Sequence, residues 1–398
     1  MSKVITYEKQ IKDLLTSRYL EAVFPAIEKT LEIFKSGRRL VFYLGIDPTG
    51  PDIHLGHITN FLVLKKIINL GHKVILLIGD FTARIGDPTG KDTARQPLSK
   101  EQIKENMKTY LSQVYKILPK GSAEIKYNSK WLEKMNLEKM IELESQVTVQ
   151  QMMARDMFQK RILEQKPISQ NEFIYPLLQG YDSVAMEVDG EIGGNDQTFN
   201  MLIGRDLVKK FLDKEKMVFT TKLLENPESG KKLMSKSEGQ YISLNYSPQE
   251  IFGKVMALSD FAILPLFTLS TEVTEGKLAQ VEKRLQEGEN PKNLKEELAL
   301  EIVKMIHGEK EAEKAKGEFK KIFSENKLPE NMVEFNVGAG MSMASFLSES
   351  LQISMTEAKR LVNGKAVSID NVTVGSWDFE VKPGNVVKAG SRRFVKAK

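Results

Sequence analysis

The chain has 398 residues and no cysteine, which excludes disulfide frameworks, thiolate zinc sites and cysteine nucleophiles. Hydrophobic residues make up 41% and charged residues 28% of the sequence, a composition typical of a folded protein rather than a disordered one. This length predicts two or three domains. Only four histidines are present, so a histidine-rich metal centre has few candidate ligands.

The formal net charge of +5 is concentrated near the C-terminus. Residues 341–398 hold nine Lys/Arg and five Asp/Glu, a net charge of +4, whereas the remainder is nearly neutral. Clustered basic charge indicates binding to a phosphate backbone, and a solubilising tail is the alternative. The first 24 residues have no apolar signal region and no run of 18 apolar residues occurs, so we expect a cytoplasmic protein without a membrane span.

Strand-like runs alternate with amphipathic helices between about residue 36 and residue 225. Residues 41–44 and 74–78 are short apolar runs typical of buried strands, and the helix between them is predicted to stop at Gly71. Residues 99–102 form a capping box that opens another helix. This alternation predicts βαβ units and therefore an α/β fold with a parallel sheet.

The alternation of strands and helices ends near residue 247, where Ser247, Pro248 and Glu250 form a helix-start signal. Helical patterns dominate from there, and Pro329, Gly338 and Gly340 then mark a loop-like stretch. We therefore predict an α/β domain at 1–246, an α-helical domain at 247–325, a linker at 326–340 and a small α+β domain at 341–398.

His54 and His57 belong to a motif that follows a strand and leads into a helix. Residues three apart lie on one side of a helical turn, so we expect both imidazoles to project together near a helix N-terminus. That terminus favours anions, and Gly56 lets a flat ligand approach the backbone. The motif suits a polyphosphate whose negative charge grows in the transition state. Two ordinary polar histidines are the first alternative and a metal site is the second, although no third His or Cys lies nearby.

The second motif is the segment SGKKLMSKSEG at 229–239. Its lysines and serines suit phosphate, and its glycines indicate a mobile loop; an exposed basic loop without function is the alternative.

A third segment, at 86–91, resembles a P-loop but does not have the spacing of one. Only three residues separate Gly86 from Gly90, and Asp92 rather than Ser or Thr follows Lys91.

The pair of HLGH at 54–57 and MSKS at 234–237 resembles the HIGH and KMSKS signatures of class I aminoacyl-tRNA synthetases. Four further segments resemble tyrosyl-tRNA synthetases of the bacterial type: YLGIDPT at 43–49, IGDPTGK at 85–91, YPLLQGYD at 175–182 and IGGNDQ at 192–197. Residues 354–369 look like the small RNA-binding domain shared with ribosomal small-subunit protein four. One position departs from the pattern, because Leu233 stands where the first lysine of KMSKS is expected and Lys232 precedes it. Either Lys232 substitutes from the adjacent position, or one phosphate contact is absent.

The resemblance implies a Rossmann-type catalytic domain that binds tyrosine beside ATP, and it implies a role for each matching residue. The tyrosine-binding residues would be Tyr43 and Asp182 at the phenol, Asp87, Tyr175 and Gln179 at the α-ammonium group, and Gln197 nearby. The ATP-binding residues would be Asp47, Gly56, Gly194, Asp196, Lys232, Met234, Ser235 and Ser237. The catalytic residues would be Thr49, His54, His57, Lys91, Arg95 and Lys236, and the RNA contacts would be Lys359, Arg360 and Lys365.

The activity implied is that of a tyrosine–tRNA ligase, which forms tyrosyl-adenylate and pyrophosphate from L-tyrosine and ATP and then charges tRNA(Tyr). ATP is a substrate, Mg²⁺ is expected with it but no protein ligand for the ion is identified, and a homodimer is implied. Two alternatives stay open. A tryptophanyl enzyme shares the fold, but Tyr43 with Asp182 and the C-terminal module favour tyrosine. A non-catalytic RNA-binding relative would have no need of the HLGH motif or Lys236.

Overall fold

The computed structural model describes most of the chain, namely residues 3–89, 98–234, 241–324, 332–338, 340–370, 372–390 and 393–398. The chain divides into two compact units. The first comprises Met1–Ser247 and Lys254–Glu309, and the second comprises Pro248–Gly253 and Lys310–Lys398. The domain limits expected at 246, 325 and 340 stay a prediction.

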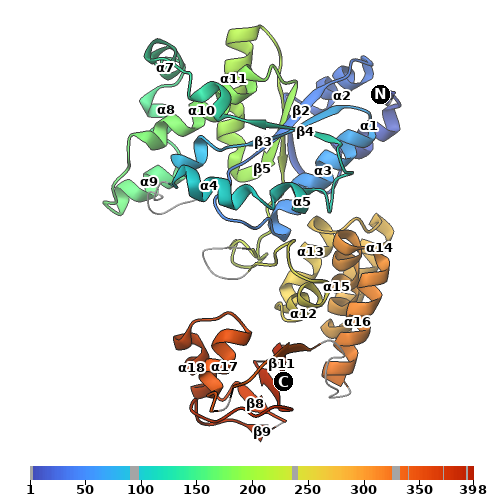
Figure 1. The fold of residues 1–398 in the computed structure, drawn as a ribbon. Helices are drawn as coiled ribbons and strands as arrows, with labels where there is room; N and C mark the ends of the chain where they lie inside the picture. The colour runs from blue at the N-terminus through green and yellow to red at the C-terminus, as the bar shows by residue number, and fades with distance from the viewer. Residues whose placement is uncertain are drawn as a thin grey trace. The chain divides into compact units, whose positions relative to one another are not determined.

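The first unit is built on a six-stranded sheet with the order β1-β6-β5-β2-β3-β4 (Figure 1). Its strands are β1 (Leu20–Phe24), β2 (Val41–Ile46), β3 (Lys73–Ile78), β4 (Ala123–Tyr127), β5 (Gly190–Gly194) and β6 (Met217–Thr221). All neighbouring strands pair in parallel except β1 and β6, which pair antiparallel. The strands predicted at 41–44 and 74–78 are confirmed as β2 and β3, and so is the parallel α/β fold.

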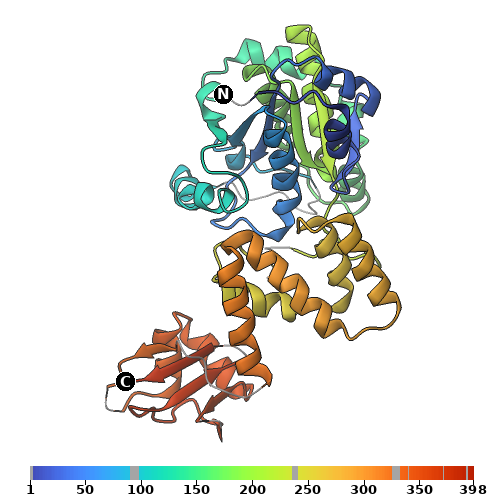
Figure 2. The same ribbon diagram turned by 90° about the vertical axis from the view of Figure 1, so that its right-hand side faces the viewer.

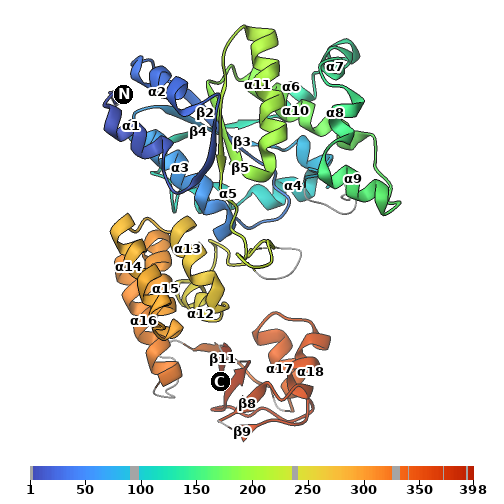
Figure 3. The ribbon, with the colours of Figure 1, turned by 180° about the vertical axis from the view of Figure 1, so that it is seen from behind.

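Helices cover both faces of this sheet (Figures 1 and 2). On one face lie α1 (Glu8–Leu15), α2 (Ile27–Lys35) and α3 (Ile58–Asn69), and on the other lie α10 (Asn171–Ala185) and α11 (Thr198–Leu212), as the view from behind also shows (Figure 3). Between β3 and α10 the chain forms α4 (Lys100–Met107), α5 (Tyr110–Val114), α6 (Ser129–Leu132), α7 (Leu137–Glu144), α8 (Val149–Met153) and α9 (Asp156–Leu163). A sheet covered on both faces explains why β3 is almost wholly apolar.

Two local signals in the sequence are confirmed. Gly71 follows the end of α3 with a φ of +88°, and a Cβ there would lie 2.5 Å from the Lys3 carbonyl oxygen, so glycine alone fits. The Ser99 hydroxyl accepts from the Gln102 amide N–H, and the Gln102 side chain accepts in return from the Ser99 N–H. This reciprocal pair starts α4, as the capping box predicts.

A helical region follows the sheet. It contains α12 (Pro248–Met256), α13 (Ile263–Leu269), α14 (Glu275–Gln286), α15 (Pro291–His307) and α16 (Glu309–Ser324), and α12 begins where the helix-start signal predicted. Arg18 anchors α13 within the first unit by donating to the carbonyl oxygens of Thr268 and Val273, both at 2.8 Å. Within the described residues no single helix has the length and apolar content of a membrane span, although α12 and Asp260–Leu269 meet them as a pair bent by 118°.

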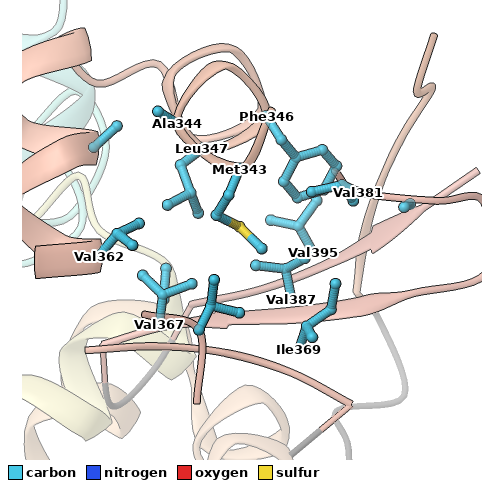
Figure 4. Close-up of a cluster of buried hydrophobic side chains, with 14 residues drawn as sticks. Met343, Ala344, Phe346, Leu347, Val362, Val367, Ile369, Val381, Val387 and Val395 are labelled. Carbon is cyan, nitrogen blue, oxygen red and sulfur yellow. The ribbon is translucent and has the colours of Figure 1, made fainter. Parts of the chain in front are cut away.

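The second unit ends in a small α+β module. It contains β7 (Val333–Phe335), α17 (Met343–Ser350), α18 (Met355–Asn363), β8 (Val367–Ile369), β9 (Val372–Thr373), β10 (Val386–Ala389) and β11 (Arg393–Ala397). Its sheet has the order β7-β11-β10-β8-β9, so β7 belongs to it although this strand lies inside the range expected to be a linker. Met343 and Phe346 of α17 pack on Val387 and Val395 of the sheet in a closed apolar core (Figure 4).

His72 lies just before β3 and is 3% exposed. Its Nδ1 accepts from the Leu40 amide at 3.2 Å, and its ring meets the Phe34 ring edge-on at 4.8 Å. Among the described residues, no atom hydrogen-bonds to its Nε2. Burial, together with the charge of Arg39, lowers the pKa of His72 to about 4.

We expect the His72→Asn variant to lose less stability in acid than the parent. Histidine in the unfolded chain has a pKa of about 6.5. Between that pH and about 4, the unfolded chain binds a proton that folded His72 does not, so the free energy of unfolding falls as the pH is lowered. Urea unfolding at about pH 7 and about pH 4.5 should show an acid-induced loss about 2 kcal/mol smaller in the variant. Asparagine retains an acceptor for the Leu40 N–H. Equal acid-induced losses of stability in parent and variant would contradict the role assigned to His72.

Candidate active site

A cavity of about 640 Å³ opens at the carboxyl ends of the parallel strands, where open α/β sheets bind ligands. Most residues expected to bind tyrosine or ATP, together with three of the expected catalytic residues, line it: Asp47, Thr49, His54, Gly56, His57, Asp87, Tyr175, Gln179, Asp182, Gly194, Asp196, Gln197, Lys232 and Met234. Tyr43 does not border it. Lys91, Arg95, Ser235, Lys236 and Ser237 lie outside the described residues, and Lys359, Arg360 and Lys365 lie in the second unit.

The histidine motif forms a 3-10 turn, η1 (Leu55–His57), at the start of α3. The start of this turn and the residue two before it pair with the segment that follows the second motif, because Leu55 N donates to Ile242 O at 3.0 Å and Leu244 N donates to Ile53 O at 2.8 Å. Met234 packs against Gly56, whose Cβ, if present, would lie 3.4 Å from the Met234 Cβ. The fold thus brings the two motifs together across almost 180 residues of sequence.

The two imidazoles lie side by side, with ring centroids 4.0 Å apart. Gly56 N donates to His54 Nδ1, and His54 N donates to His57 Nδ1, both at 3.2 Å. Because His54 Nδ1 accepts the Gly56 N–H, a neutral His54 ring carries its proton on Nε2, which makes Nε2 a hydrogen-bond donor. His57 Nδ1 also lies 3.3 Å from the His54 carbonyl oxygen, so its role as donor or acceptor depends on its tautomer. The expected projection of both histidines from one turn is therefore present.

Asp47 occupies the cavity floor after β2. Its Oδ1 accepts from the Thr82 hydroxyl at 2.7 Å, and its Oδ2 accepts from the Tyr175 hydroxyl at 2.9 Å. A Cβ on Gly79 would lie 1.9 Å from Asp47 Oδ1, so the carboxylate rests directly against the backbone that follows β3. Two hydroxyl donors fix the direction in which this carboxylate points.

Asp182 lies on α10 and is 3% exposed. Trp131 Nε1 donates to its Oδ1 at 2.7 Å, and Asn128 Nδ2 donates to its Oδ2 at 3.2 Å. Burial raises the pKa of this carboxyl well above its ordinary value, and the two donors counteract the rise. Sequence reasoning missed Asn128 and Trp131, although their position just after the strand β4 was a usable signal.

Tyr43 lies in β2 and is fully buried. Its hydroxyl and the Ser183 hydroxyl are 2.9 Å apart, and both lie behind the cavity wall. Burial and the nearby carboxylates of Glu191 and Asp182 raise the pKa of Tyr43 well above its ordinary value, so the phenol stays protonated. Its expected contact with the substrate stays a prediction.

A chain of amides joins the residues expected at the α-ammonium group. Gln179 Nε2 donates to Glu191 Oε1 at 3.0 Å, and Asn200 Nδ2 donates to Gln179 Oε1 at 3.0 Å. Asn200 also donates to Gln197 Oε1 at 3.1 Å, and Gln197 Nε2 donates to Asp87 Oδ2 at 2.7 Å. Sequence reasoning missed Glu191 and Asn200.

Asp196 and Lys232 both line the cavity and form an ion pair. Lys232 Nζ lies 2.7 Å from Asp196 Oδ2, and Lys232 is the only Lys or Arg among the described residues that line the cavity. A Cβ on Gly194 would lie 2.6 Å from Asp196 Oδ1, so glycine gives this carboxylate room. Lys232 thus reaches the cavity even though Leu233 occupies the expected lysine position.

Two kinds of polar group line the cavity. Asp47 and Asp182 are linked through Thr82 and Asn128, and the part of the cavity that they line is called the acceptor-rich end. The two histidines also line the cavity, and so does Lys232, which pairs with Asp196. Acceptors of this kind suit a cation and a hydroxyl, whereas the imidazole and ammonium donors suit an anion. No group of three His, Cys, Asp or Glu that could hold a metal occurs in the parts of the chain that the structure describes.

The three basic residues expected to bind RNA differ in their surroundings. Lys359 Nζ lies 4.2 Å from the centroid of the Trp377 ring, which is 43% exposed. Arg360 forms an ion pair with Glu357 at 2.7 Å one helical turn away. Lys365 follows α18 with a positive φ of 53°.

Comparison with known proteins places the chain in a family. The sequence pattern of the class I tRNA synthetases (W and Y) matches residues 35–324. A tyrosine–tRNA ligase 2 of Vibrio parahaemolyticus is 42% identical over 381 residues, which cover 95% of this chain and 96% of the relative. The tyrosine–tRNA ligase of Thermotoga maritima is 39% identical over 396 residues, which cover 98% of both chains.

Solved structures agree on the fold. A C-terminally truncated mitochondrial tyrosyl-tRNA synthetase of Aspergillus nidulans superimposes with a TM-score of 0.63 at 23% identity, covering 79% of this chain and 94% of that one. A tyrosyl-tRNA synthetase of Archaeoglobus fulgidus complexed with L-tyrosine gives a TM-score of 0.60 at 19% identity, covering 78% and 100%. On sequence and fold together, the chain belongs to the tyrosine–tRNA ligases of the class I tRNA synthetase family.

Proposed function

We propose that the cavity activates L-tyrosine with ATP and then transfers the tyrosyl group to the 3′-terminal ribose of tRNA(Tyr). In the first step a tyrosine carboxylate oxygen bonds to the α-phosphorus of ATP while the bond to pyrophosphate breaks. In the second step a ribose hydroxyl attacks the tyrosyl carbonyl carbon and AMP leaves. The observation that carries the proposal is the meeting, in one cavity, of an acceptor-rich end with the paired histidines.

Tyrosine would bind at the acceptor-rich end. Asp182 would accept from the substrate phenol, since Trp131 and Asn128 already direct both of its oxygens. A phenylalanine side chain would offer this buried carboxylate no third donor and would place an apolar ring edge against it, which is costly. Tyr43 would act at the phenol from behind the wall, where its hydroxyl meets Ser183.

The α-ammonium group would meet Asp87, Tyr175 and Gln179, whose oxygens supply the acceptors that a cation requires. Gln197 would hold Asp87 in place through the bond from its Nε2. ATP would lie toward the histidines, with Asp196 and Gly194 at its ribose and with Asp47, Gly56 and Met234 along its length. Ser235 and Ser237 would supply hydroxyls to its phosphates.

Catalysis would come from positioning and from charge stabilisation, because the substrate carboxylate is itself the nucleophile. The imidazoles of His54 and His57 would face the charge that grows on the leaving pyrophosphate, with His54 Nε2 as a donor. Thr49, Lys236, Lys91 and Arg95 would contribute further donors. Lys232 would replace the lysine missing at Leu233, because its ammonium already reaches the cavity. Mg²⁺ would accompany ATP, but no cluster of described residues fits it, so we assign it no protein ligand.

The C-terminal module, residues 341–398, would bind tRNA. Lys359, Arg360 and Lys365 would contact phosphates, and Trp377 beneath Lys359 offers a flat face for a base. The net charge of +4 over residues 341–398 supports an electrostatic grip of this kind. ATP and tRNA are both present in the cytoplasm, which is the location that we propose.

We also propose a homodimer formed through α7, α8 and α9, which Figure 1 shows together at one edge of the catalytic unit. Leu137, Ile141, Val149 and Leu163 on these helices are 75%, 57%, 69% and 84% exposed. Large exposed apolar side chains on neighbouring helices are typical of an association surface. A closed symmetric pair would bury this face on both subunits.

The proposed reaction predicts tyrosine-dependent exchange between ATP and pyrophosphate without tRNA. Each candidate amino acid would be tested alone with the purified chain. We expect exchange with L-tyrosine and little with L-phenylalanine or L-tryptophan, because only tyrosine offers a phenol to Asp182. Exchange driven by tryptophan would favour the tryptophanyl alternative, and no exchange with any amino acid would favour a pure RNA binder.

Removing the His54 imidazole should slow exchange by roughly 100-fold with tyrosine affinity retained, the usual cost of one transition-state donor. Two variants separate this role from support of the turn. His54→Ala removes both ring nitrogens, whereas His54→Asn keeps an acceptor for Gly56 N but has no donor at the Nε2 position. Slow exchange in both variants is expected, and normal exchange in His54→Asn would contradict the assigned role.

The dimer proposal predicts that the L137D/L163D variant sediments as a monomer while the parent sediments as a dimer. Charges on this face oppose its burial against a second copy. Analytical ultracentrifugation measures the mass directly. Val372→Asp, at a residue that is 68% exposed on the small sheet, is the matched control and should leave the dimer intact. A monomeric parent would refute the proposal.

A further inference from the structure

A buried ion pair lies directly behind the acceptor-rich end of the cavity. Lys216, just before β6, and Glu191 of β5 are both nearly inaccessible, with side chains 0% and 3% exposed, and Lys216 Nζ donates to Glu191 Oε2. Glu191 borders the cavity, whereas Lys216 does not. Removing two charges from water costs free energy that their mutual attraction need not recover, so stability alone does not explain this ion pair.

The ammonium of Lys216 sits in a site built for it. Its three N–H groups have three acceptors, since besides Glu191 it donates to the Ser183 hydroxyl at 2.8 Å and to the Met201 carbonyl at 3.2 Å. The space exists because α11 carries Gly204 at this point. A Cβ there would lie 2.5 Å from Lys216 Nζ. The lysine is therefore fixed by geometry as well as by charge.

The ion pair determines the orientation of the Gln179 side-chain amide. A glutamine amide has a donor end and an acceptor end that can exchange by rotation. Glu191 Oε1 accepts from Gln179 Nε2, and this requires Oε1 to be an acceptor. Lys216 donates to the other oxygen, Glu191 Oε2, so the proton shared by the ion pair lies at Oε2 whether lysine or carboxylate holds it. Glu191 Oε1 therefore remains an acceptor. The Gln179 amide must then point its Nε2 toward Glu191 and its own Oε1 away from it.

We propose that Lys216 and Glu191 are positioning residues that hold Gln179 with its oxygen presented to the α-ammonium group of the amino-acid substrate. Asn200 donates to that oxygen at 3.0 Å and uses one of its two lone pairs, which leaves the second for the substrate. This inference rests on the proposed role of Gln179.

The test compares two ligands that differ only in the α-ammonium group, L-tyrosine and 3-(4-hydroxyphenyl)propionate. The variant is Glu191→Gln combined with Lys216→Met, since Lys216→Met alone strands a buried carboxylate and can fail to fold. The double change removes one charge of each sign, so the net charge near the cavity stays the same. The amide that Glu191→Gln introduces would be free to donate or to accept, and the orientation of the Gln179 amide would no longer be enforced.

We expect the double variant to bind L-tyrosine about tenfold more weakly by calorimetry, the worth of one hydrogen bond to a charged group. Its affinity for the propionate should stay within about twofold of the parent. The exposed Lys210→Met is the matched control and should change neither affinity. Equal losses for both ligands, or no loss for L-tyrosine, would overturn the proposal. Failure of the proposed function itself would show separately, as absence of tyrosine-dependent exchange in the parent.

Discussion

The parallel pairing of β2 with β3 and β5 is the constraint on which the site depends. Parallel strands end at one edge of the sheet, so the residues that follow β2, β3, β4 and β5 converge there although they are far apart in sequence. Asp47, Asn128 and Gly194 are all brought to the cavity in this way. The sheet would place other side chains there equally well; the chemistry comes from which residues the chain supplies at those ends.

A second constraint follows from burial. A carboxylate removed from water needs partners, and each one near the cavity has them: Asp47 has two hydroxyl donors, Asp182 an indole and an amide, and Glu191 an amide and an ammonium. These partners leave the carboxylates in fixed orientations. A ligand with one cation and one hydroxyl therefore meets acceptors that do not have to be reorganised when it binds.

Local signals made much of this predictable. The apolar runs of β2 and β3, the capping box of α4 and the histidine turn are each written within a few neighbouring residues, and the structure contains them all. The partners of the site residues were not predictable in this way. Lys216 lies 25 residues from Glu191, and Asn128 lies 54 residues from Asp182, so neither pairing has a local pattern. The position of Tyr43 behind the cavity wall likewise depends on Ser183, a serine that its own sequence surroundings do not distinguish.

The departure at Leu233 shows how the fold tolerates a shifted residue. Lysine has a long flexible stem, so a cation can reach the same space from a neighbouring backbone position. Lys232 lines the cavity, and the bridge between Glu225 and Lys232 fixes the backbone from which its side chain extends toward Asp196. The ion pair with Asp196 places that ammonium beside the residue proposed to hold the ribose. On our proposal, the positive charge would matter more to ATP than the sequence position from which it comes.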